Sequence, residues 1–275
     1  MSDMQGFLFG DATDVVDDDV ARTELRLLAW NVQSPSLERT RRQLDWLYQS
    51  RVNVLVLTEV KTGDGSAHLA KDLESNGFDV HLAALGPGEK YPNLIATKGY
   101  RARPLPLGLA SPRLTGVRLA SHLGDLDVIA LYALTNGMTT ESSRNRAAFQ
   151  HQVLAALAER IAADPGVPLV VAGDFNVLEP GHVPPSNLFE EHDYAFYRAL
   201  ADLGLLDAYR LEHPQGGDLS WYGPQGGQRL DHVFLTAALR GDVTDCGFDH
   251  HARTSKLSDH SALALTLGPG RQATR

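Results

Sequence analysis

The sequence predicts an α+β fold, in which many short strands are covered by a few helices. Nine short apolar runs recur along the 275 residues, each ending in polar residues. Three longer stretches show helical periodicity, and they do not alternate strictly with the strands. This irregular order favours layered α+β architecture over a doubly wound parallel sheet.

The first half of the chain supplies six of the expected strands. Leu25–Trp30 and Val52–Thr58 are almost continuously apolar, as buried strands are, and Leu37–Tyr48 between them has a helical pattern. Turns that contain glycine or proline separate four further runs. These expected strands are Phe78–Ala83, Asn93–Thr97, Thr115–Leu119 and Asp127–Ala133.

The second half begins with the longest predicted helix, Ser142–Ala163, whose apolar residues recur once per helical turn. The strand Leu169–Ala172 follows it, and a proline-rich loop comes next. The remaining expected elements are a helix over Glu191–Leu203 and strands over Leu230–Leu235 and Ser261–Thr266.

The composition excludes several classes of protein. Hydrophobic residues make up 43% of the chain, but no run of eighteen apolar residues exists, so we expect no membrane span. The acidic N-terminus lacks a secretion signal pattern. The single cysteine, Cys246, excludes an internal disulfide and a cysteine zinc site, and it is compatible with a reducing, cytoplasmic location.

Charge is concentrated at the N-terminal end. Residues 1–24 hold seven acidic residues and one arginine, a net −6 of the total −9, which leaves −3 for the rest. We therefore expect a flexible acidic leader at 1–24, one domain at 25–268 and a polar tail at 269–275. A mildly acidic body disfavours a sequence-tolerant nucleic-acid coat, although an enzyme with a local basic patch remains possible.

Polar side chains stand where the expected strands end. The first strand is followed by Asn31, the second by Glu59, and the strand at 169–172 by Gly173, Asp174 and Asn176. In extended chain, residues two apart point the same way, so Asp174 and Asn176 are expected to face one site. Gly173 would let the backbone approach whatever they hold. The late segments add Asp231, Asp259 and His260.

If these ends converge, four carboxylates share one pocket, an arrangement that requires a cation or protonation. The oxygen ligands are hard, which favours Mg²⁺ or Mn²⁺ over zinc. A histidine beside acidic residues is suited to proton transfer or to stabilising charge. The set predicts metal-assisted attack of water on phosphorus.

Each fragment also has a purely structural explanation. Gly-Asp-Phe-Asn is a common strand-end turn, Asp259-His260 could cap a loop, and Glu59 with Lys61 could form an exposed pair. Tyr132 and Trp221 would ordinarily be core aromatics. The functional interpretation rests on the joint occurrence of the fragments, each at a strand end.

The order of these fragments resembles the endonuclease/exonuclease/phosphatase superfamily, and most closely its exonuclease III/apurinic endonuclease branch. Glu59-Val60-Lys61 resembles that branch's E-T-K segment, and Lys90-Tyr91-Pro92-Asn93 is similar to a later signature. The passages Gly204–Arg210 and Leu219–Tyr222 look like its helix-to-tryptophan region. The resemblance spans residues 25–266 and implies a deoxyribonuclease I-like, four-layer, two-sheet β-sandwich flanked by helices.

The resemblance also implies roles for individual residues. Glu59 would be the main metal ligand, with Asn31 nearby and Asp259 assisting. Asp174 would position or deprotonate water, and Asn176 would hold the phosphate. His260, paired with Asp231, would contact the scissile phosphate. Tyr132 would bind phosphate or assist the leaving group, Trp221 would wall the pocket, and Asn136 and Arg144 are further candidates for substrate binding.

Three positions depart from the branch. Gln33 stands where the branch has a second Asn or Asp, and Thr58 replaces a Gln. The segment after Tyr132 lacks the branch's proline, and its Asn is one position later. Two arginine groups, Arg39/Arg41/Arg42 and Arg144/Arg146, could contact a phosphate backbone or simply form solvated helix faces.

The sequence therefore predicts a Mg²⁺- or Mn²⁺-dependent phosphoester hydrolase, with DNA as the first candidate substrate of an exonuclease III-like endo- or exonuclease. A phosphodiesterase or phosphatase for a small molecule, nucleotide or lipid is the first alternative. A catalytically silent paralogue that binds a partner is the second. We expect a monomer whose partner is DNA or another phosphoester, and no membrane association.

Overall fold

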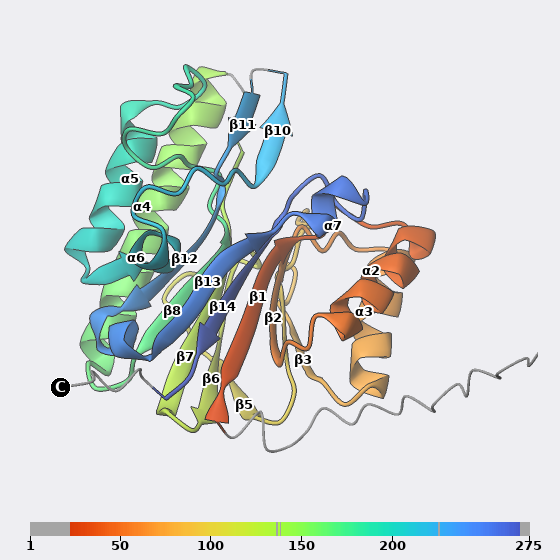
Figure 1. Cartoon of the computed structure of the whole chain (residues 1–275). Coiled ribbons are helices and arrows are strands. Elements are labelled where there is room, and N and C mark those ends of the chain that lie inside the picture. The colour runs from red at the N-terminus through yellow and green to blue at the C-terminus, as the bar shows by residue number, and fades with distance from the viewer. Residues whose placement is uncertain (1–22, 136, 138, 225, 270–275) are drawn as a thin grey trace, which may run out of the picture.

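The computed structural model describes residues 23–135, 137, 139–224 and 226–269, and its centre is a pair of six-stranded mixed sheets (Figure 1). The first sheet has the strand order β13-β14-β1-β2-β4-β3. Its strands are β13 Val243–Asp249, β14 Ala262–Leu267, β1 Leu25–Asn31, β2 Val54–Thr58, β4 Leu94–Thr97 and β3 Asp79–Leu82.

The second sheet has the strand order β5-β6-β7-β8-β12-β9. Its strands are β5 Arg101–Leu105, β6 Leu114–Ser121, β7 Gly124–Tyr132, β8 Leu169–Asp174, β12 Asp231–Thr236 and β9 Leu205–Asp207. A separate two-stranded ribbon pairs β10 Trp221–Gly223 with β11 Gly226–Gln228.

Helices cover the outer face of each sheet, which gives four layers (Figure 1). The helices α2 Leu37–Gln49 and α3 Asp64–Ser75 pack on the first sheet, and α4 Thr140–Ala163 and α5 Glu191–Asp202 pack on the second. Shorter elements are α6 Ala208–Glu212, the 3-10 helix η1 Ala237–Asp242 and α7 His251–Thr254. None of the described helices is both long and apolar enough to cross a membrane.

Burial of apolar side chains holds the layers together. The central cluster lies between the sheets and includes Val56, Val128 and Val170, all fully buried. Outer clusters join α2 and α3 to the first sheet and α4 and α5 to the second, through residues such as Leu47 and Phe196. The two sheets are thus buried on both faces, which explains their nearly continuous apolar runs.

The topology brings several strand ends to one edge. Parallel β1 and β2 are connected through α2, and parallel β7 and β8 through α4. Antiparallel β12 begins at that edge beside the end of β8, with Asp231 opposite Asp174. Residues that follow β1, β2, β7 and β8 therefore lie together with those that precede β12 and β14.

All nine expected strands and all three expected helices are present, with ends shifted by up to three residues. The largest shift extends the expected strand 127–133 back to Gly124. The predicted leader lies almost wholly outside the described residues, and so does nearly all of the predicted tail.

Candidate active site

The shared sheet edge gathers Asp174, Asp231 and His260. Asp174 ends β8, Asp231 begins β12, and His260 precedes β14. Ligand atoms of these three side chains all lie within 4.8 Å of one another, and all three are buried. Such a group, fixed by three different strands, is positioned by the sheets rather than by a mobile loop.

Asp231 and His260 form a buried pair. The His260 Nδ1 lies 2.7 Å from the Asp231 Oδ2. Burial alone would lower the pKa of the His260 ring, but the negative charges of Asp231, then Asp174 and Asp259, outweigh it, so this pKa is raised. The ring is therefore held as a cation, with its Nε2 available to a further partner.

The side chains of Trp30 and Ser258 hold the backbone of His260 in place. The Trp30 indole donates to the His260 carbonyl at 3.2 Å, and the His260 N–H donates to the Ser258 hydroxyl at 3.1 Å. Ser258 in turn donates to the Asn31 carbonyl at 2.6 Å. The histidine is thereby tied to the end of β1.

Asp174 is held by two amides. Its Oδ2 accepts from the Asn31 side chain at 2.9 Å, and its Oδ1 accepts from the Asn176 backbone N–H at 3.0 Å. Burial and the neighbouring charge of Asp231 raise the pKa of the Asp174 carboxyl, although His260 and both amides act in the opposite direction. A carboxylate with a raised pKa is a stronger base towards a water molecule.

One detail of the sequence prediction is wrong. Asn176 is not in extended chain, because its φ is 49° and its side chain donates to the Ala133 carbonyl at 3.1 Å. A turn, rather than strand alternation, brings it beside Asp174. Gly173, at φ 135°, is needed because a Cβ would lie 2.3 Å from the Leu131 carbonyl oxygen and 3.0 Å from Thr58. This close approach between strands explains why a glycine stands here.

Backbone strain is concentrated at this edge. Gln33, Ser34, Glu59 and Asn176 have φ between 45° and 56°, a region that residues other than glycine rarely adopt. Ser34 and Glu59 support each other through a hydroxyl–carboxylate bond of 3.0 Å and a backbone bond of 3.1 Å. Such strain is typical of sites where side-chain direction matters more than stability.

Tyr132 lies near both Asp174 and Glu59. Burial, and then the charges of Asp174 and Glu59, raise the pKa of the Tyr132 hydroxyl, so this tyrosine stays protonated. Within the described chain, only Ser34 forms a hydrogen bond with the half-buried Glu59 carboxylate. The Trp221 indole donates to the Asp259 carboxylate at 3.1 Å.

The acidic group could bind a metal ion. The buried Oδ1 of Asp231 has no hydrogen-bond partner among the described residues, and such an oxygen is costly to bury without a cation or a donor. The group Asp174, Asp231 and His260 contains none of the three residues predicted as metal ligands, which are Glu59, Asn31 and Asp259.

The remaining predicted residues divide into three outcomes. Asn136 lies outside the described residues. Arg144 is exposed on α4 and lines a cavity of about 480 Å³ with Ser143 and Asn187. Arg146 cannot contact a phosphate backbone as suggested, because it is fully buried and paired with Asp193 at 2.6 Å.

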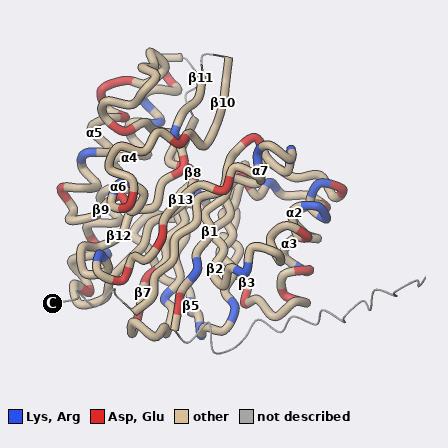
Figure 2. Tube along the Cα trace, viewed as in Figure 1, with Lys and Arg blue, Asp and Glu red and all other residues tan. Residues whose placement is uncertain are grey.

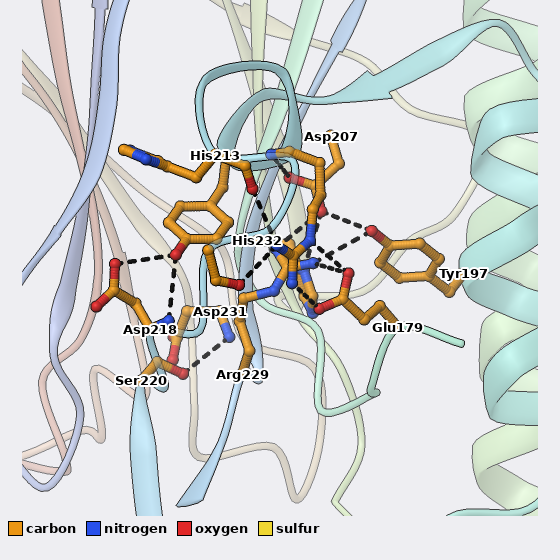
Figure 3. A network of polar contacts seen from close by, with 12 residues as sticks. Glu179, Tyr197, Asp207, His213, Asp218, Ser220, Arg229, Asp231 and His232 are labelled. Atoms are coloured by element: carbon orange, nitrogen blue, oxygen red, sulfur yellow. Dashed lines mark hydrogen bonds and ion pairs between the residues drawn. The ribbon is translucent and has the colours of Figure 1, made fainter. Parts of the chain in front are cut away.

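Sequence reasoning missed the residues that hold Asp231. Arg229, two residues earlier, is buried and ion-paired at 2.8 Å with both Glu179 and Asp207 (Figure 3). The Ser220 hydroxyl accepts from the Leu230 and Asp231 backbone N–H groups at 3.0 and 3.2 Å. The Arg-Leu-Asp string was the available signal, but the partners of Arg229 are distant in sequence.

Comparisons with known proteins place this site in context. Residues 28–260 match the Endonuclease/Exonuclease/phosphatase family. The 3′ phosphatase NExo from Neisseria, bound to product DNA hairpin, aligns with a TM-score of 0.76 at 19% identity, over 89% of this chain and 100% of that one. An AP endonuclease from Archaeoglobus fulgidus gives 0.75 at 22% identity, over 88% and 99%.

A third structure, the AP endonuclease LMAP from Leishmania major, gives a TM-score of 0.73 at 18% identity, over 90% of this chain and 88% of that one. These likenesses show the deoxyribonuclease I-like fold. A segment of 85 residues is also 33% identical to a protein named xylose isomerase from Novosphingobium aromaticivorans. It covers 31% of this chain and only 19% of that protein.

Proposed function

The chain belongs to the endonuclease/exonuclease/phosphatase family, and we propose that it is a divalent-metal-dependent hydrolase that cleaves phosphodiester bonds of DNA, as an exonuclease III-like endo- or exonuclease. The observation that carries the proposal is the buried group of Asp174, Asp231 and His260 at the shared edge of the two sheets. A binding protein gains nothing from two buried carboxylates against an oriented imidazole, and the arrangement costs stability.

Each residue has a chemical task in this proposal. Asp174 accepts a proton from the attacking water, since its pKa is raised and its direction is fixed by Asn31 and Asn176. The His260 cation donates through Nε2 to a phosphate oxygen, while Asp231 holds its other nitrogen. The protonated Tyr132 hydroxyl donates to the leaving group.

A magnesium or manganese ion is part of the proposal. Glu59 would hold it, with Asn31 and Asp259 beside it, because these are hard oxygen donors and the Asp231 Oδ1 shows that the pocket has an unbalanced carboxylate oxygen. When bound, the ion supplies Lewis-acid polarisation of the phosphate. Asn176 would contact the phosphate, and Trp221 would form a wall of the pocket.

The argument for DNA as the substrate comes from the proteins whose structures are similar to this one. The Neisseria 3′ phosphatase was solved with a DNA hairpin, and two other similar structures are AP endonucleases. We further propose that residues 25–268 act as one catalytic unit, as a monomer in the cytoplasm, where the single buried Cys246 would stay reduced.

A phosphodiesterase for a small molecule is the second candidate. The contacts that the arginines of the two predicted groups make within the fold favour it. Arg146 is buried, and Arg39 donates to the Gln33 and Ser34 carbonyls, so both serve the fold. Arg42 donates to the Ser255 carbonyl at 2.9 Å. Few arginines of the two predicted groups therefore remain free to follow a long duplex.

The test is an activity screen of the full chain with added Mg²⁺ or Mn²⁺. It sets plain, nicked and abasic duplexes against nucleotides and a generic phosphodiester such as bis(p-nitrophenyl) phosphate. Faster turnover of a duplex supports the proposal, and faster turnover of the small diesters supports the second candidate. Absence of turnover on every substrate would instead favour the catalytically silent paralogue.

A further inference from the structure

Arg113 lies next to the candidate active site, and no feature of the mechanism uses it. It immediately precedes β6, and its guanidinium carbon lies 4.5 Å from the centre of the Tyr132 ring and 5.5 Å from that of Tyr91. Its Nη1 donates to the Tyr132 carbonyl at 3.4 Å. Two tyrosine rings and a carbonyl thus hold the cation in place.

Many arginines of the fold are compensated by a carboxylate, and Arg113 is not, among the residues that the structure describes. Arg118, Arg146, Arg160, Arg210 and Arg229 each form an ion pair with at least one carboxylate. Across the described ranges of the chain, no carboxylate lies within 4.0 Å of the Arg113 guanidinium. The half-buried cation is therefore uncompensated.

The backbone of Arg113 is as well fixed as its side chain. Its carbonyl accepts from the Tyr132 N–H at 2.9 Å, and the preceding Pro112 carbonyl accepts from the Asn93 N–H, also at 2.9 Å. The residue is therefore bound to both β7 and the start of β4. Its position does not need to be organised when a ligand arrives.

A cavity of about 380 Å³ opens beside this arginine. Arg113 and Tyr132 form part of its wall, and hydroxyl and amide groups of Thr139, Ser142 and Asn145 line it as well. Glu141 is its one acidic lining residue. The Tyr132 side chain that lines this cavity also lies near the carboxylates of Asp174 and Glu59, whose charges act on its hydroxyl.

We propose that Arg113 binds a second phosphate of the substrate, one nucleotide away from the phosphate that is cleaved. A guanidinium that lies over two tyrosine rings without an ion-pair partner in the described chain can present N–H groups to an anion, and its planar donor fork suits phosphate. The neutral hydroxyl and amide groups around it can donate to the same phosphate, and they can donate to or accept from a sugar hydroxyl beside it. Arg113 is then a residue that determines specificity for a substrate with at least two phosphates.

This inference rests on the proposed function, and it also has a rival: the arginine could serve only to hold the Tyr132 ring. The second phosphate itself has two sources. It could be the next phosphodiester of a nucleic-acid strand or the terminal monoester of a small molecule. The experiment is designed to separate these possibilities.

The first measurement compares kcat/KM on three substrates: thymidylyl-thymidine, the same dinucleotide with a terminal phosphate, and the thymidine trinucleotide. Arg113→Met keeps an apolar stem against the tyrosine ring and removes the charge. We expect it to reduce kcat/KM about 10- to 100-fold for a substrate that carries the second phosphate. On thymidylyl-thymidine the change should stay within about threefold. If kcat/KM depends on Arg113 for the trinucleotide alone, the second phosphate belongs to a nucleic-acid strand. If kcat/KM depends on Arg113 for the dinucleotide with a terminal phosphate, the second phosphate belongs to a small molecule.

Two controls accompany this comparison. Arg101→Met removes an exposed arginine from the opposite end of the same sheet and should leave all three rates unchanged. Arg113→Lys keeps the charge without the planar fork and should recover part of the preference. An equal loss on all three substrates would show that Arg113 only positions Tyr132, and it would overturn the inference.

The second measurement does not require turnover. Binding of a fluorescein-labelled single-stranded oligonucleotide is followed by anisotropy in excess chelator, at several salt concentrations. Arg113→Met should reduce the slope of log affinity against log salt by about 0.7, the value for one phosphate contact on a single strand. An unchanged slope excludes a nucleic-acid strand as the source of the second phosphate. Together with no dependence on Arg113 for the terminal phosphate, it overturns the inference even if the wild type is an active hydrolase. A reduced slope in a protein that cleaves nothing supports it while the proposed function fails.

Discussion

The Asp231 carboxylate has two oxygens with different environments. One accepts from the His260 ring at 2.7 Å, and the other is buried without a hydrogen-bond partner among the described residues. The first oxygen fixes which nitrogen of His260 faces the pocket. The second oxygen carries negative charge that a bound cation or a hydrogen-bond donor of the substrate would balance. One residue thus serves both the histidine and the charge of the site.

Because the two side chains act through one hydrogen bond, their loss should not be additive. We expect Asp231→Asn and His260→Ala each to lower kcat by about 10²–10⁴, and the double variant to be little worse than the poorer single variant. Steady-state rates of the three variants at saturating metal measure this. Losses that multiply would show that the residues act independently.

Glu59 offers a separate test, since its carboxylate has a single hydrogen-bond partner in the described chain, Ser34. Glu59→Gln keeps the size of the side chain and removes the charge. The Mg²⁺ concentration for half-maximal activity should rise at least about tenfold, and excess chelator should abolish wild-type activity. Asp231→Asn is the matched comparison, because it should lower the maximal rate more than the metal requirement. Full activity in chelator would eliminate the metal from the mechanism.

The site residues that directly follow or precede a strand could be predicted from the sequence. Asp174, Asp231 and His260 follow or precede apolar runs, so their convergence could be inferred from the sequence. The roles of Ser220, Arg229 and Arg113 could not, because each acts through partners 10 or more residues away. Hydrophobic periodicity shows which face of a helix or strand is buried. It carries no information on contacts between side chains that are distant in sequence.

At the scale of elements, the Arg229 cluster joins the start of β12 to the loop after β8 and to β9. Arg229 pairs with Glu179 and Asp207, and Tyr197 of α5 donates to Asp207 at 2.6 Å (Figure 3). Burial would raise the pKa of both carboxyls, but the arginines and, for Asp207, His232 outweigh it, so both pKa values are lowered. The cluster therefore stabilises the fold only while these carboxylates are charged.

This cluster predicts how stability depends on pH. Lowered pKa values in the folded state mean that the unfolded chain binds more protons in acid, so the stabilisation is complete above about pH 5 and is lost as pH falls further. Asp207→Asn should cost about 3–5 kcal/mol at pH 7, since it weakens the pairing of a buried arginine. Urea unfolding at pH 7 and pH 3.5 checks this. The variant should lose less than the wild type between the two values, and an equal loss would contradict the assignment.

Prediction of elements succeeded for long or apolar segments and failed for short or mixed ones. The helix α3 was missed because its buried positions, Gly65, Ser66, Leu69 and Leu73, include only two large apolar residues. The edge strand β5 has mostly exposed residues and contains Pro104, so its sequence resembles a loop. Strand β13 has only two buried residues, Val243 and Cys246, and contains Gly247. Packing in the finished fold, not local preference, makes these segments regular.

At the scale of the molecule, the distribution of charge bears on whether the substrate is a duplex or a small molecule. Basic residues are visible on α2, near α7, at the end of the sandwich that holds the site (Figure 2). Of the three arginines of α2, Arg39 holds the loop at 33–34, while Arg41 and Arg42 are exposed. Arg41 and Arg42 are candidates for contacts with a duplex that reaches past the site.

The salt dependence of binding distinguishes a duplex from a small substrate. Each phosphate that the protein neutralises releases counterions, so log affinity should fall against log salt with a slope of about −0.9 per contact on a duplex. If DNA is the substrate, changing both Arg41 and Arg42 to Gln should weaken binding and reduce the slope by about 1.8 at most, with little change in the chemical step. Arg101→Gln, at the far end of the second sheet, should change neither. A wild-type slope near zero, together with faster turnover of a nucleotide or generic diester than of any duplex, would assign the site to a small phosphoester instead.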